Sequence, residues 1–427
     1  MVPSLSPATQ LLRDHAPDTS PFEGVYKYFH ANPELSLVEN DTANTIASHA
    51  ALSAYTVHPS IGGHGLACVL ENGPGPKVLL RADIDALPVL EKTGLDYAST
   101  ARMVDSADGV EKPVMHACGH DMHITCLLAA AKWLSSEEVV KKWAGTLMLV
   151  FQPNEERAGG AQAMVDDGLY KKIPIPDVVL GQHVMSLRTG KVGVRTGTMM
   201  AAADSFKVTL YGRGGHGSMP HLCVDPVLLA ANVVVRLQGI VSREVDPQDS
   251  AVVTVGSLQA GQTENVIAEE AVLRVNVRTQ TTATREQVLK AIRRIVEKEC
   301  EASGCEKKPL IEETTRFPLT PNDGTVTSKL SETFKNTFGE DFIADLVGSN
   351  ASEDVSILAT SVGRPCCFWF FGGVDASKWD KAAKDGRIAQ DVPSNHSPYF
   401  APVVQPTLKT GTEALCAAAL TFLGSKE

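Results

Sequence analysis

The densest group of chemically reactive side chains lies in the segment PVMHACGHDMH, residues 113–123. Three histidines, a cysteine and an aspartate fall within nine consecutive residues of it. Thiolate and imidazole groups this close together suit zinc or a similar transition metal. Gly119 allows a tight turn, so Cys118 and His120 can both point toward one ion. The segment predicts a metal site; the alternative is a histidine-rich loop before a helix.

Two adjacent carboxylates follow an apolar strand, in FQPNEE at residues 151–156. Carboxylates held side by side repel each other unless a cation or a proton lies between them. Of Glu155 and Glu156, one would bind the metal and the other could act as a general base toward a water. The competing interpretation is a solvated turn, in which proline, asparagine and glutamate are common.

Three further segments place a histidine at a strand end or in a loop. His183 lies in GQHV and His396 in SNHSP, and each by itself is more often a rim or core residue than a ligand. The third segment, GRGGHGSMPH at 212–221, carries His216 among four glycines. It lacks the strand-to-helix spacing of a dinucleotide-binding loop, which excludes that type of site.

The composition is that of a globular enzyme. The 427 residues are 43% apolar and 21% charged, which allows two or three domains. A net charge of −11 argues against nucleic acid and anionic membranes as partners. No apolar run reaches the length of a membrane helix. Nine scattered cysteines and an N-terminus without a secretory signal predict a cytoplasmic protein.

The hydrophobic patterns divide the chain into two domains, both of the α/β class. In residues 1–195 buried strands alternate with apolar helices, and this arrangement returns in 316–427, which predicts a mostly parallel sheet covered on both faces. In residues 196–315 the strands alternate apolar and polar residues between amphipathic helices. This middle part is predicted to be an inserted, smaller α/β sandwich with one sheet face open.

These motifs occur in an order and at spacings that resemble the dinuclear-metal aminoacylase and carboxypeptidase family of metallopeptidases. The most similar branch is that of the hippurate hydrolases and the indoleacetyl-amino-acid hydrolases. HANPELSLVE near the N-terminus and LLRADIDALPV at 79–89 also resemble that branch. The resemblance extends over roughly residues 28–422. It implies a zinc-peptidase-like catalytic domain with an inserted lid or dimerisation domain.

The resemblance also implies a set of site residues and a cofactor. The cofactor would be two divalent ions, zinc or manganese, with cobalt or nickel as alternatives. Glu155 matches the general base, and His216 resembles a residue that reaches into the partner subunit's site and stabilises the oxyanion. Asn265 matches a substrate-binding asparagine, and Arg278 lies where a carboxylate-binding cation would be useful. The implied metal ligands are Cys118, His120, Glu156, His183 and His396.

One departure from the family touches the metal site. The wider family has an HxD motif before a proline, and this chain has Asp83 and Asp85 at the two matching positions. Asp83 thus stands where a ligand histidine would be, and the Cys118 thiolate would supply the missing ligand. Asp85 would orient a metal-bound histidine. The alternative is a pair of solvated carboxylates in a turn.

Together these features predict a metal-dependent hydrolase of N-acyl amino acids, such as indoleacetyl conjugates, or of small dipeptides. The enzyme would be a homodimer through the inserted domain, or else a monomer with that domain as a lid. Two other classes remain open. One is a hydrolase with Cys118 as nucleophile and His116 or His120 as base, and the other is a non-catalytic metal-binding scaffold.

Overall fold

A computed structural model describes residues 6–426; the first five residues of the N-terminal segment discussed above lie outside this range. Contacts divide the chain into two units. The first contains the residues up to Met199, 321–347 and those from Asp354 onward, and the second contains 200–320 and 348–353. The sequence pattern predicted these junctions after residues 195 and 315.

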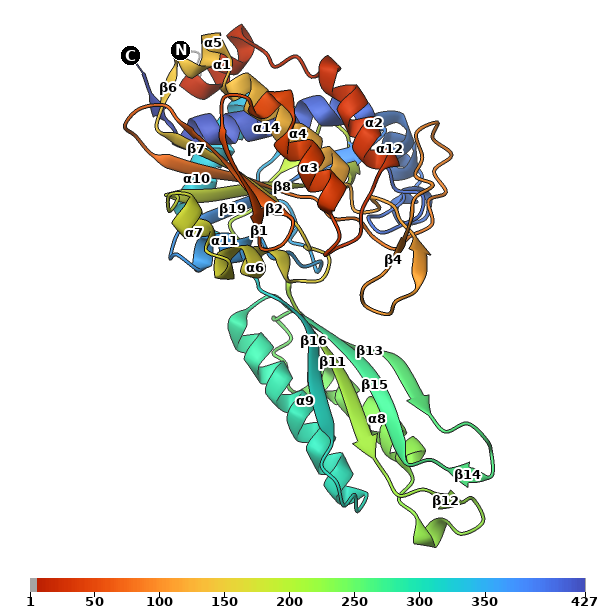
Figure 1. Cartoon of the computed structure of the whole chain (residues 1–427). Coiled ribbons are helices and arrows are strands. Elements are labelled where there is room, and N and C mark those ends of the chain that lie inside the picture. Colours follow the sequence, from red (N-terminus) through yellow and green to blue (C-terminus); the bar gives the residue numbers. More distant parts are fainter. Residues whose placement is uncertain (1–5, 427) are drawn as a thin grey trace. The chain divides into compact units, whose positions relative to one another are not determined.

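The first unit is built on an eight-stranded sheet with the strand order β1-β2-β7-β3-β8-β19-β9-β18 (Figure 1). Within the group β7-β3-β8-β19 each strand is parallel to its neighbour. Strand β2 is antiparallel to both of its neighbours, β1 and β7. The predicted α/β class with a mostly parallel sheet is confirmed. The strands are β1 (Thr56–Ile61), β2 (Gly65–Glu71), β3 (Lys77–Asp83), β7 (Thr146–Gln152), β8 (Val178–Arg188), β9 (Val192–Gly193), β18 (Phe342–Ile343) and β19 (Cys366–Val374).

Helices cover both faces of this sheet, which explains why β7 is buried along its whole length. One face is covered by α4 (His120–Leu134) and α14 (Val404–Phe422), which pack on each other and on β3 and β8. The opposite face carries α6 (Gly160–Asp166) and α11 (Ser356–Thr360), on the lower side of the sheet in Figure 1.

The order of the strands differs from their order in the chain. β2 and β3 are joined by a short turn, yet they are not neighbours, because β7 lies between them and pairs with both. This inversion brings the carboxyl ends of β3 and β7 side by side. The remaining elements of the first unit are α1 (Pro7–Asp14), α2 (Glu23–Ala31), α3 (Asn40–Ala47), α5 (Glu137–Val140), α7 (Leu169–Lys172), α10 (Gly324–Phe338), α12 (Ala376–Lys384), α13 (Ile388–Asp391), β4 (Arg102–Val104), β5 (Glu111–Pro113), β6 (Trp143–Ala144) and β20 (Gly424–Ser425).

The second unit is a four-stranded antiparallel sheet with the order β13-β15-β11-β16. Its helices α8 (Pro226–Arg243) and α9 (Thr282–Ala302) share one hydrophobic core with the sheet, and β13 alternates between half-buried and exposed residues. The predicted α/β sandwich with one open face is confirmed. The strands are β11 (Ala202–Tyr211), β13 (Ala251–Ala260), β15 (Glu270–Thr279) and β16 (Leu310–Phe317), with a small pair formed by β12 (Gly215–His216) and β14 (Val266–Ile267); β10 (Gly197–Met200) and β17 (Thr320–Asn322) lie where the chain passes between the units.

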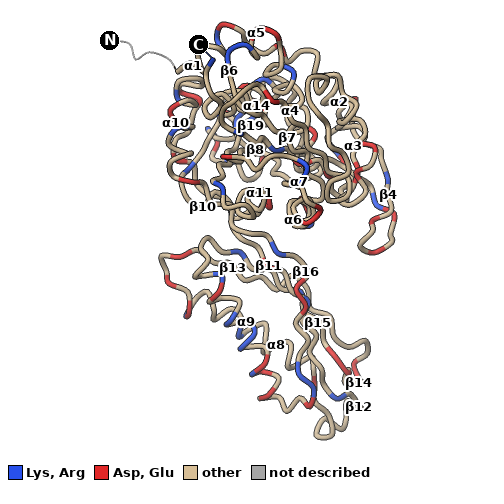
Figure 2. The backbone as a smooth tube through the Cα atoms, turned by 60° about the vertical axis from the view of Figure 1, so that its left-hand side comes forward, with Lys and Arg blue, Asp and Glu red and all other residues tan. Residues whose placement is uncertain are grey.

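Helix α8 is apolar on two faces. Among residues 6–426 it is the one helix long and apolar enough to cross a membrane by length and composition. However, Leu229, Val233 and Leu237 on one face pack in the core of the second unit. The other face exposes Leu228 and Val235, which are 62% and 73% accessible. Acidic and basic residues are interspersed over both units (Figure 2).

A candidate metal centre at the carboxyl ends of the strands

Residues within or just after three neighbouring strands lie at one edge of the first sheet. Asp83 ends β3, Glu155 and Glu156 follow β7, and His183 lies on β8. In open α/β sheets the carboxyl ends of parallel strands are the usual position of a functional site. The amino end of α4 and the loop before α14 bring the other predicted ligands to the same edge.

The five predicted ligands converge on one point. The Sγ atom of Cys118 lies 3.4 Å from Nε2 of His183 and 3.3 Å from Nε2 of His396. Oε1 of Glu156 lies 3.5 Å from Nε2 of His396 and 3.8 Å from Nε2 of His120. Sulfur and nitrogen ligands of one tetrahedral zinc ion are about 3.5 Å apart, as their bond lengths require. The separations therefore fit atoms that share a cation.

Hydrogen bonds fix the tautomers of two of these histidines. Nδ1 of His183 donates to the Val184 carbonyl at 2.7 Å, and Nδ1 of His120 donates to the Asp85 carbonyl at 2.8 Å. Each Nε2 atom therefore directs a lone pair toward the centre. Burial lowers the pKa of His183 well below its usual value, so this ring is neutral, as a metal ligand must be.

Two polar atoms at the centre are buried without a hydrogen bond: Nε2 of His120 and Oε1 of Glu156. Burial alone lowers the pKa of His120, but Asp83, Asp85 and Cys118 outweigh it and raise that pKa well above its usual value. Cys118 and Glu156 likewise raise the pKa of His396. The acidic groups thus favour positive charge at the centre, and a divalent cation fits this donor set.

Asp85 supports both sides of this centre. Its Oδ2 atom accepts hydrogen bonds from the Glu156 amide at 3.0 Å and from the Ser36 hydroxyl at 2.7 Å. Its Oδ1 atom lies 3.3 Å from Nδ1 of His120. Asp83 and Asp85 are completely buried, so the alternative of solvated turn carboxylates is wrong for this pair. Glu155 is 5% exposed, and one of its oxygens lies within 4.8 Å of ligand atoms of His120 and Glu156.

Gly119 makes the approach of Cys118 and His120 possible. Its φ of 87° is in the left-handed region, directly before α4 begins. A Cβ atom at this position would lie 2.4 Å from the Val184 side chain. Glycine is therefore required both by the backbone conformation and by the close packing of the loop on β8.

Asp83 is not free for a metal, because neighbours occupy its carboxylate. Oδ2 accepts a hydrogen bond from Arg81 at 2.8 Å, and Oδ1 is 2.5 Å from Nδ1 of His123. Nε2 of His123 in turn accepts the Val184 amide at 2.8 Å. Both nitrogens of His123 are thus used, and the chain of contacts from Arg81 to Val184 braces β8 next to His183.

Sequence reasoning missed this bracing chain and two other supports. An arginine inside the apolar strand KVLLRAD was the available signal for Arg81, since a buried cation needs a partner. Glu39 accepts the Asn154 amide at 2.8 Å, and burial followed by the nearby Asp85 raises its pKa to about 7. Asn395 donates to the carbonyls of Cys118 and Val184 at 3.1 and 3.0 Å, and so holds the His396 loop against the centre.

The other predicted site residues belong to the second unit. Nδ1 of His216 accepts the Ser218 amide at 3.1 Å, so in the neutral ring Nε2 carries the proton. The backbone of Asn265 is held beside it, because its carbonyl accepts the Gly217 amide at 2.8 Å. Arg278 donates to Asn276 and Ser352, and none of residues 6–426 places a carboxylate within ion-pair distance of it.

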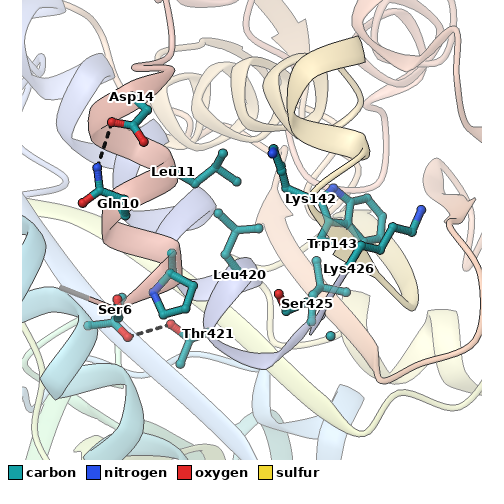
Figure 3. A pocket seen from close by; sticks show the side chains of 15 residues that line it. Ser6, Gln10, Leu11, Asp14, Lys142, Trp143, Leu420, Thr421, Ser425 and Lys426 are labelled. Atoms are coloured by element: carbon teal, nitrogen blue, oxygen red, sulfur yellow. Dashed lines mark hydrogen bonds between the residues drawn. The ribbon is translucent and has the colours of Figure 1, made fainter. Parts of the chain in front are cut away.

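A cavity of about 480 Å³ lies elsewhere in the first unit (Figure 3). It has an apolar wall that includes Leu11 and Leu420, and Lys142 and Lys426 at its rim. Trp143, also in its lining, belongs to β6, just before the amino end of β7. This cavity is therefore separated from Glu155 by the length of β7, about 20 Å, and takes no part in the metal centre.

Comparisons with known proteins agree with this geometry. Residues 79–392 match Peptidase family M20/M25/M40. Hippurate hydrolase of Campylobacter jejuni is 40% identical over 75% of this chain and 79% of its own length. IAA-amino acid hydrolase ILR1-like 4 of Arabidopsis thaliana is 33% identical over 88% of this chain and 80% of its own. A Bacillus subtilis structure described as a dinuclear metal binding peptidase from the M20 family has a TM-score of 0.73 and 25% identity, covering 94% of this chain and 97% of that one.

The chain therefore belongs to the M20/M25/M40 peptidase family, and the resemblance seen in its motifs is confirmed. It is a hydrolase of the amidohydrolase and carboxypeptidase type found in that family. The group formed by Cys118, Glu156 and His396, with His120 and His183 beside it, is the candidate metal site.

A buried ion-pair network at the start of α4 predicts a pH-dependent stability. Burial alone lowers the pKa of His30, but hydrogen bonds to Asp121 and Glu91 outweigh burial and raise that pKa from 6.5 to about 9. His30 therefore stabilises the fold fully below about pH 6.5 and loses this contribution as the pH rises through about 9. With chelator present, the difference in unfolding free energy between wild type and His30→Gln should fall by about 3 kcal/mol from pH 6 to 9.5.

Chemical denaturation across this pH range measures that difference. His221→Gln, at an exposed histidine, is the matched control and should show no such pH dependence. A difference for His30→Gln that stays constant with pH would contradict an ionised His30.

The bracing role of His123 predicts a loss of metal affinity when its hydrogen bonds are removed. His123→Phe keeps a ring of similar size and all five candidate ligands, but it releases Asp83 and the Val184 amide. Affinity for zinc or manganese, measured by competition with a chelator, should fall by about 10–100-fold. His116→Phe is the control, because neither ring nitrogen of this buried histidine makes a hydrogen bond. Equal affinities of the two variants would show that His123 has no bracing role.

Proposed function

We propose that this protein hydrolyses the amide bond of N-acyl amino acids or small dipeptides, with two divalent ions, zinc or manganese, as cofactor. The observation that carries the proposal is the convergence of one thiolate, three imidazoles and one carboxylate beside Glu155. The names of the similar proteins, hippurate hydrolase and IAA-amino acid hydrolase, support an N-acyl amino acid substrate. The proposed ligands are Cys118, His120, Glu156, His183 and His396.

The protein's own residues would divide the reaction between them. Bound divalent ions supply Lewis acidity that polarises the amide carbonyl and acidifies the attacking water. Glu155 takes the proton from that water and delivers it to the leaving amine. His216 of a second copy offers its Nε2–H to the negative charge that develops on the carbonyl oxygen. Asn265 and Arg278 bind the free carboxylate of the amino acid, for which a guanidinium without an acidic partner is suited.

A cysteine-nucleophile hydrolase is the second candidate. Sγ of Cys118 is in contact with the Nε2 atoms of His183 and His396, which is an arrangement that could activate a thiol. Of the two bases suggested by the sequence, His120 interacts with Cys118, which helps to raise the pKa of that histidine, whereas neither ring nitrogen of His116 makes a hydrogen bond. A non-catalytic scaffold is a weaker candidate, because the position of the general base is occupied by Glu155.

Chelation and one conservative substitution separate these functions. The wild type is expected to release free amino acid from a panel of N-acyl amino acids, and to lose this activity when the metal is removed. Glu155→Gln should retain metal but lose about 10²–10⁴-fold in kcat. Glu138→Gln, at an exposed position, should behave as wild type.

Metal content by elemental analysis and amine release measured together decide between the candidates. Activity that survives chelation but not alkylation would identify Cys118 as the nucleophile. Bound metal without hydrolysis of any acyl amino acid or dipeptide would favour the scaffold. Near-normal turnover in Glu155→Gln would refute the assignment of the base.

We further propose that the protein is a cytoplasmic homodimer that associates through the second unit. The support is the outward apolar face of α8 with Leu228 and Val235, next to β13, an edge strand with one paired side. Apolar faces and open edges of this kind commonly pair across a two-fold axis. All nine cysteines are free thiols, which supports a reducing compartment.

A charge placed on the outward face of α8 should dissociate the proposed dimer. Val235→Lys is expected to sediment as a monomer at concentrations where the wild type is a dimer, because an unpaired ammonium would be buried. Val347→Lys is the control, since Val347 is 84% exposed in the first unit. A wild type that sediments as a monomer would support the lid interpretation instead.

A further inference from the structure

A small apolar recess borders the candidate metal centre. It has a volume of about 220 Å³ and is lined by residues 35–36, 86–88 and 156–157. One of its walls is Glu156, whose Oε1 atom faces His120 and His396. A group held in this recess would therefore lie against Glu156, one of the proposed metal ligands.

The walls of the recess are held in place by backbone contacts and packing. Leu35 and Ala86 are almost completely buried and belong to one small hydrophobic cluster with Val114. Leu87 exchanges two backbone hydrogen bonds with Met115, both of 3.0 Å. The shape of the recess is therefore preformed, as is usual for a small-molecule subsite.

The charges around the recess do not favour a carboxylate. The Ser36 hydroxyl is already donated to Asp85. The guanidinium of Arg157 forms an ion pair with Asp105, so mainly its methylene groups are left for the wall. A group that enters beside Glu156 therefore meets apolar walls without an uncompensated cation. This excludes the free carboxylate of an amino acid and favours an uncharged acyl group.

The volume sets the size of that group. An apolar cavity of about 150 Å³ holds benzene, so a recess of this size has room for one six-membered ring and its link to the carbonyl. An acetyl group would leave it largely empty, and a long alkyl chain would exceed it. We propose that this recess is the acyl subsite, that it prefers a single ring, and that Leu87 sets its depth; the inference rests on the proposed function.

A larger hollow beside the His396 loop is the competing position for the acyl group. It has a volume of about 710 Å³ and is lined by residues 388–394, with Lys378, Ser397 and Tyr399. None of the five candidate ligands lines it, and its lining carries two charged side chains, Lys378 and Asp391. The smaller recess is therefore the better match for an apolar acyl group.

Substitutions at Leu87 test the subsite with substrates that differ in the acyl group alone. Leu87→Trp should lower kcat/KM for N-benzoylglycine by at least about 10-fold and leave N-acetylglycine within about 3-fold of wild type, because one methylene in an apolar pocket already changes selectivity by about 10–200-fold. Leu87→Ala should shift the preference toward N-(2-naphthoyl)glycine. Ile388→Trp, in the larger hollow, is the matched control and should leave all three ratios unchanged.

The outcomes separate the subsite from the function on which it rests. A wild type that hydrolyses neither these three substrates nor any other N-acyl amino acid or dipeptide of the panel refutes the proposed function, and the subsite with it. If the substrates are hydrolysed but the Leu87 substitutions do not change their relative kcat/KM values, the subsite alone is refuted. The same holds if Ile388→Trp changes these relative values. Thermal unfolding and metal content identify a misfolded variant. If Leu87→Trp is misfolded, the shift of preference toward the naphthoyl substrate in Leu87→Ala tests the subsite instead.

Discussion

The rest of the structure depends on a concentration of negative charge buried at the carboxyl ends of β3 and β7. Burying an ion without compensation costs several kcal/mol, so each carboxylate needs a partner. Asp83 is satisfied by Arg81 and His123, and the Oδ2 atom of Asp85 accepts hydrogen bonds from Ser36 and the Glu156 amide. Two atoms that lack a hydrogen bond, Nε2 of His120 and Oε1 of Glu156, lie 3.8 Å apart at the candidate metal centre, where a cation could bind both of them.

Asp83 stands where the resemblance to the family implied a ligand histidine, and both of its carboxylate oxygens contact neighbouring side chains. That acid holds His123, and His123 holds the strand that carries His183. Cys118 meanwhile reaches the centre from the tight turn at Gly119. Asp83 therefore supports the candidate ligand His183 through His123.

The two units have different physical tasks. The first has a sheet covered on both faces, and most of the charged groups at its edge are buried. The second covers its sheet on one face, and α8 remains apolar on its outward side. A catalytic site benefits from the buried edge of a sheet that is covered on both faces. Association with another chain benefits from an exposed apolar face such as that of α8. The recess proposed for the acyl group belongs to the first unit, and its walls lie next to the loops that carry Asp85 and Glu156.

Much of this molecule is determined by local sequence. Apolar periodicity specified the main strands and helices, and the motif spacing brought out five candidate ligands and Glu155, because both signals depend on residues close together in the chain. Other features depended on tertiary structure. The placement of β7 between β2 and β3, the pairing of Arg81 with Asp83, and the use of both His123 nitrogens join residues far apart in sequence. The recess beside Glu156 is likewise formed by three separate segments. These contacts form because buried charges must be neutralised and apolar groups enclosed when the chain packs. A local sequence pattern does not show which distant residues will meet.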